Sequence, residues 1–120
     1  MSVIVWADIP VVDLERATAF YVHALGVPVG SPPGMEGHVA VIMGEAPSAD
    51  LALSTGIAPT TTAGTTVYLG ANGDIDGMLA RVQEAGGRVL QPKEFMGEMI
   101  GWIAFVVDTE GNRIGIQQPG

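Results

Sequence analysis

The chain has 120 residues, of which 48% are hydrophobic and 15% are charged, with a formal net charge of −8 and no cysteine. These values favour a single compact domain over residues 1–120 and exclude disulfides, thiolate metal sites and a disordered chain. The acidic balance also argues against nucleic acid and anionic membranes as partners, because both attract Lys and Arg.

The first half of the chain predicts a strand, a helix and three further strands. Val3–Val12 alternates in the two-residue period of a strand, which places Trp6 and Asp8 on the face opposite Ala7 and Ile9. A capped helix with an apolar stripe and three short extended segments follow, at Asp13–Leu25, Val27–Val29, His38–Met43 and Leu51–Ser54.

The second half repeats this order of elements. Thr65–Gly70 predicts a strand with Tyr68 on the face opposite Val67 and Leu69. Asp74 caps a predicted helix that ends before two glycines. The remaining elements are extended residues and a hairpin whose turn carries Asp, Gly and Asn, at Arg88–Gln91, Gly101–Val107 and Arg113–Gln117.

The repeat indicates the fold class. We expect an α+β domain made of two βαβββ modules, with module one at about residues 1–60 and module two at about 61–120. Neither four-stranded half readily buries both faces of its sheet alone. Together they would form a cupped, mostly antiparallel eight-stranded sheet, an incomplete barrel with helices on the convex face and a cavity inside.

Two motifs carry a resemblance to a known family. They are D-L-E-R-A-T-A-F-Y-x-x-x-L-G in module one and D-T-E-G-N-R-I-G-I in module two. With the repeated βαβββ order, they resemble the vicinal oxygen chelate superfamily, the group of glyoxalases, bleomycin-resistance proteins, fosfomycin-resistance enzymes and extradiol dioxygenases. VYLGANGDIDGMLARVQEAGGRVLQPKE and EMIGWIAFVVDTEGNRIGIQ look closest to its small bacterial "predicted enzyme related to lactoylglutathione lyase" branch.

The resemblance also implies where metal ligands would stand. Metal enzymes of the family carry His and carboxylate ligands on the cavity faces of the first and last strands of each module. Carried over by position, these places fall at Trp6, near Tyr68, near Gly115 and around Leu53 or Ser54. None of these is a usual metal ligand, so we expect no cofactor and no metal site, with a weakly bound divalent metal as the alternative.

The cavity side retains a small set of residues that could bind a ligand. Asp8 is an inward carboxylate and thus a candidate catalytic base or cation anchor, or else an ordinary hydrogen-bonded residue at a strand end. The aromatic residues could stack a flat ligand or could simply be core. The predicted ligand-binding set is Trp6, Asp8, Tyr68, Trp102 and Gln117.

Two functions are compatible with this set. The first is a binding protein for a small, partly hydrophobic molecule, without the family's usual metal. The second is a metal-dependent glyoxalase-like lyase or isomerase that uses Asp8 as base or ligand, so whether the chain is an enzyme stays open. We also expect a homodimer, since a cupped sheet leaves open edges and rims. The lack of a long apolar run and of a signal peptide favours a cytoplasmic protein without membrane partners.

Overall fold

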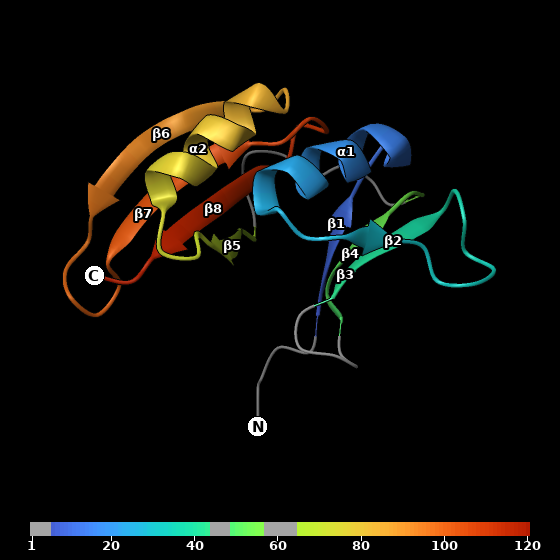
Figure 1. Ribbon diagram of the computed structural model, residues 1–120, viewed down its shortest axis with the longest axis horizontal. Coiled ribbons are helices and arrows are strands. Elements are labelled where there is room, and N and C mark those ends of the chain that lie inside the picture. The colour runs from blue at the N-terminus through green and yellow to red at the C-terminus, as the bar shows by residue number, and fades with distance from the viewer. Residues whose placement is uncertain (1–5, 44–48, 57–64) are drawn as a thin grey trace.

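The computed structural model describes residues 6–43, 49–56 and 65–120 and contains the βαβββ order twice (Figure 1). Module one consists of β1 (Ala7–Pro10), α1 (Leu14–Leu25), β2 (Val29–Gly30), β3 (Val39–Met43) and β4 (Ala49–Ser54). Module two consists of β5 (Val67–Gly70), α2 (Ile75–Glu84), β6 (Arg88–Phe95), β7 (Trp102–Val107) and β8 (Arg113–Gln118). The predicted two-module α+β fold is therefore confirmed, while positions 3–5 of the first predicted strand lie outside the described residues.

The strands form two mixed four-stranded sheets with the same topology. Their strand orders are β1-β4-β3-β2 and β5-β8-β7-β6. In each sheet the first and last strands of the module pair in parallel, and the other pairs are antiparallel. Within the described residues the eight strands are thus divided between two sheets and do not form one continuous sheet, and no barrel closes.

Both helices begin and end with the local chemistry that the sequence predicts. The Asp13 side chain accepts a hydrogen bond from the Arg16 backbone N–H at 3.0 Å, and Asp74 caps α2 in the same way through Gly77. Gly26 ends α1 in the left-handed conformation, with φ +69°, which a residue without a Cβ adopts readily.

One hydrophobic core lies between the helices and the sheets, and the helices lie on the same side of the molecule (Figure 1). Side chains of alternate strand positions enter this core, such as Ile9 and Leu53 in module one and Val106 and Ile116 in module two. The other strand positions point away from the helices. We call that side of each sheet its open face.

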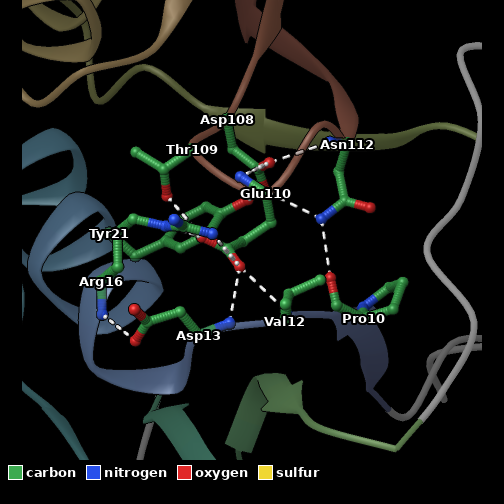
Figure 2. A network of polar contacts seen from close by, with 9 residues as sticks. All are labelled: Pro10, Val12, Asp13, Arg16, Tyr21, Asp108, Thr109, Glu110 and Asn112. Atoms are coloured by element: carbon green, nitrogen blue, oxygen red, sulfur yellow. Dashed lines mark hydrogen bonds and ion pairs between the residues drawn. The ribbon is translucent and has the colours of Figure 1, made fainter.

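A buried polar network joins the two modules at the turn between β7 and β8 (Figure 2). The Asp108 carboxylate accepts hydrogen bonds from the backbone N–H groups of Glu110 and Asn112, at 2.8 and 2.9 Å. It also accepts from the Tyr21 hydroxyl of α1 at 2.6 Å and from the Asn112 amide at 3.0 Å. That amide donates further to the Pro10 carbonyl of β1 at 2.8 Å. The predicted turn motif is thus also a contact between modules.

Glu110 extends this network to the start of α1 (Figure 2). Its fully buried carboxylate accepts from the backbone N–H groups of Val12 and Asp13, at 2.8 and 2.9 Å, and from Arg16 Nε at 2.7 Å. Burial by itself would raise the pKa of Glu110. The hydrogen bonds from Arg16, Asp13, Val12 and Thr109 outweigh it and lower the pKa from its usual 4.5 to about 2. Module two therefore completes the N-terminal cap of a helix in module one.

Candidate functional site

An open groove of about 450 Å³ lies on the open face of module two. The strand register explains its composition, because Tyr68, Gly115 and Phe105 are neighbours across β5, β8 and β7 and share one face. The connection between β6 and β7 forms one lip. The lining residues are Tyr68, Gln91, Glu94, Met96, Met99, Ile100, Ile103, Phe105 and Gln117.

The aromatic end of the groove depends on a glycine in β8. A Cβ atom on Gly115 would lie 2.4 Å from Cδ2 of Tyr68, so only glycine leaves room for the Tyr68 ring where it is. This ring meets Phe105 edge to face, with centroids 5.8 Å apart. Tyr68 is still 52% exposed, and its face is available to a ligand.

The opposite end of the groove is held by Gln117. Its Nε2 donates to the Ile100 carbonyl at 2.7 Å and so ties the lip to β8. The lip itself is closed by backbone hydrogen bonds from Met96 N to Gly101 O and from Gly101 N to Gly97 O, at 2.8 and 2.7 Å. Met99, which is 97% exposed, contributes a flexible apolar side chain to the lining of the groove.

The predicted site residues occupy three places. Tyr68 and Gln117 line the groove. Trp6 and Asp8 lie on the open face of module one, both exposed, and Asp8 accepts a hydrogen bond from the Ser54 hydroxyl at 3.0 Å. Asp8 belongs to the sheet of module one, Trp6 immediately precedes β1, and neither residue lines the groove.

Trp102 does not share a face with Tyr68 and Gln117, contrary to the expectation from sequence. It has the same parity as Ala104 and Val106, which point under the helices, so its ring packs against the core. On that side the centroid of the Trp102 ring lies 5.2 Å from the centroid of the Phe95 ring. Lys93 Nζ lies 4.9 Å from the Trp102 centroid.

Several groove residues were not among the predicted site residues, and strand pairing was the missing signal. Ile103 and Phe105 alternate with the buried positions of β7, and Phe105 pairs with Gly115. Gln91 and Glu94 belong to β6, which continues to Phe95 and so extends beyond the predicted Arg88–Gln91.

The strand register relates the first strands of the two modules. Pro10 pairs with Ser54 as Gly70 pairs with Gln117, so the position in module one that corresponds to Tyr68 is Asp8, and Trp6 corresponds to Thr66, two residues before Tyr68. The corresponding last-strand positions hold Ala52 and Gly115.

These four equivalent positions do not fit a tightly bound divalent metal. They offer one carboxylate, one phenol and no other side-chain donor, whereas stable metal sites use three or more His, Asp, Glu or Cys ligands. Among residues 6–43, 49–56 and 65–120, no group of three such side chains is placed to hold a metal ion.

The comparisons with known proteins agree with this fold. A model of the Glyoxalase/Bleomycin resistance protein/Dioxygenase superfamily matches residues 3–116. A glyoxalase/bleomycin resistance protein from Albidiferax ferrireducens T118 is 23% identical, with a TM-score of 0.74 over 96% of this chain and 97% of that one. A hypothetical protein from S. aureus is also 23% identical, with a TM-score of 0.72 over 98% and 94%.

A more distant solved structure is an E126Q mutant of the fosfomycin resistance protein FosX from Listeria monocytogenes, in complex with Mn(II) and 1S,2S-dihydroxypropylphosphonic acid. It is 13% identical, with a TM-score of 0.74 over 100% of this chain and 92% of that one. At these identities the solved structures support the fold alone. No curated protein matches the chain in sequence. Neither helix of the described residues is long and apolar enough to cross a membrane.

Proposed function

The chain belongs to the Glyoxalase/Bleomycin resistance protein/Dioxygenase superfamily, and on this basis we propose that it binds a small, partly hydrophobic molecule in the groove of module two without a tightly held metal. The observation that carries the proposal is the groove itself. Its volume of about 450 Å³ suits a small organic molecule, and its walls combine Tyr68 and Phe105 with Met and Ile side chains.

The character of the lining residues supports binding over catalysis by Asp8. Aromatic rings provide a flat apolar surface, and Met side chains adapt to the shape of a ligand. Asp8 is exposed, hydrogen-bonded to Ser54 and absent from the groove. Among the described residues, the equivalent strand positions provide one carboxylate and one phenol, and this donor set supports metal-free binding over a metal-dependent lyase or isomerase.

Replacing Tyr68 by alanine tests this function. We expect the affinity for the neutral fluorescent probe N-phenyl-1-naphthylamine to fall about tenfold, because an exposed aromatic surface of the groove is lost. Fluorescence titrations in the presence of EDTA measure this loss and the independence from metal together. Leu90→Ala is the matched control, since Leu90 is exposed on β6 but does not line the groove. Equal probe affinity in the wild type and in Tyr68→Ala would refute the proposed site.

We also propose a homodimer in which the open face of module one, with Trp6 and Asp8, covers the groove of the other copy. Trp6 is 59% exposed, and a second copy would bury both this side chain and the apolar lip. Such a pairing would unite Trp6 and Asp8 with Tyr68 and Gln117, the residues that the sequence assigns to one site.

Light scattering tests the homodimer. At tens of micromolar, the wild type should have the mass of two chains, and Trp6→Glu should have the mass of one because it adds a charge to an apolar contact between acidic copies. Val22→Glu serves as the control, since Val22 is an exposed apolar residue on α1, away from both open faces. A monomeric wild type, or equal dissociation by Val22→Glu, would count against the pairing.

A further inference from the structure

We propose that the groove selects a flat apolar ligand that carries a positive charge, and that the cationic group binds at Glu94. This inference rests on the proposed function and specifies its ligand class. It follows from the distribution of charge around the groove.

Among the described residues that line the groove, Glu94 is the only one with a charged side chain. Its Oε2 lies 3.4 Å from Gln91 Nε2, at the long end of hydrogen-bond distances, and the side chain is on the exposed strand β6. The carboxylate therefore keeps most of its capacity to accept hydrogen bonds from a ligand.

The nearby basic residues are engaged elsewhere. Arg113 shares the open face of module two, but its guanidinium is stacked 4.0 Å from the centroid of Phe105 and donates to the Thr66 hydroxyl at 2.7 Å. Lys93 is paired with Asp76 of α2 at 2.8 Å, beside Trp102 on the helix side of the sheet. Neither basic residue lines the groove.

The strand register places the negative charge of Glu94 and the positive charge of Arg113 at different ends of the groove. Glu94 pairs with Ile103, and Ile103 pairs with Gln117, whereas Arg113 stands four residues earlier on β8. Four residues of strand correspond to about 13 Å. A ligand cation is thus repelled at the Phe105 end and attracted at the Glu94 end, so the apolar body of the ligand should lie toward Tyr68 and Phe105.

The rest of the molecule favours the same sign of ligand. The net charge of −8 raises the local concentration of cations and lowers that of anions.

A pair of probes with one ring system and opposite charge tests the inference. Isothermal titration calorimetry at low salt would compare 2-naphthylmethylammonium with 2-naphthoate. We expect the wild type to bind the cation about three- to tenfold more tightly than the anion. Glu94→Gln keeps the shape of the groove and should make the two affinities nearly equal. Glu36→Gln removes the same charge from an exposed loop of module one and should keep the preference for the cation.

The outcomes separate this inference from the proposed function. Equal binding of both probes by the wild type, with binding lost in Tyr68→Ala, would overturn the charge selection and leave the groove as the binding site. Binding of both probes that is unchanged by Tyr68→Ala would overturn the site itself. A preference for the cation that Glu94→Gln and Glu36→Gln reduce equally would assign it to the net charge of the chain and overturn the role of Glu94.

Discussion

Replacing Asp108 by alanine is expected to lower the free energy of unfolding by about 3–5 kcal/mol. Asp108 is buried and accepts four hydrogen bonds, including one from the buried Tyr21 hydroxyl. Burial, and then the charge of Asp108, raise the pKa of Tyr21 well above its usual 10, so the phenol stays protonated and donates. Without the carboxylate, these donors would remain in the interior without their acceptor. Urea denaturation followed by circular dichroism measures the loss.

Asp76→Ala is the matched control for this prediction. Asp76 is an exposed carboxylate on α2 whose ion pair with Lys93 lies at the surface, so its removal should change the free energy of unfolding by less than about 1 kcal/mol. If Asp108→Ala were no more destabilising than this control, the network would not hold the modules together.

Glu110 should make the stability of the protein fall as the solution becomes acidic. Its pKa is about 2 in the folded protein and 4.5 in the ordinary case, so folding favours the ionised form. The stabilisation is complete above pH 4.5 and is lost as the pH falls from 4.5 through about 2. The difference in pKa corresponds to at most about 3 kcal/mol.

The variant Glu110→Gln isolates this contribution. Its free energy of unfolding at pH 7 should be lower by up to about 3 kcal/mol, and it should depend less on pH between 4.5 and 2.5 than in the wild type. Urea titrations at several pH values give both quantities. Glu98→Gln, which changes an exposed carboxylate, should keep the acid dependence of the wild type. An unchanged acid dependence in Glu110→Gln would assign the effect to other carboxylates.

Much of the fold could be predicted from sequence because its signals are local and occur twice. Asp13 and Asp74 cap the helices, as the sequence predicts, and Gly26 ends α1 in the left-handed conformation. The two-residue period also predicts one face for Tyr68 and Gln117, and both line the groove of module two. These assignments need only the chain neighbours of each residue.

The residues that line the groove could not be predicted from such local patterns. Trp102 belongs to the helix-facing positions of β7, and its aromatic character gave no information about the face. In β6 the register shifts twice between Val89 and Glu94, so simple alternation does not assign the faces of Gln91 and Glu94. The lip depends on a hydrogen bond between Gln117 and Ile100, 17 residues apart, which no local pattern predicts.

The cap that Glu110 supplies to α1 has a consequence for synthesis on the ribosome. Val12, Asp13 and Arg16 are made early, but their partner lies 94–98 residues later in the chain. Until that turn emerges, α1 has its own Asp13 cap and lacks both the Glu110 carboxylate and the Asp108 acceptor for Tyr21. A nascent first module should therefore remain accessible to proteases and chaperones. Its α1 helix should become fully stabilised only when the hairpin of β7 and β8 has been synthesised and has folded against it.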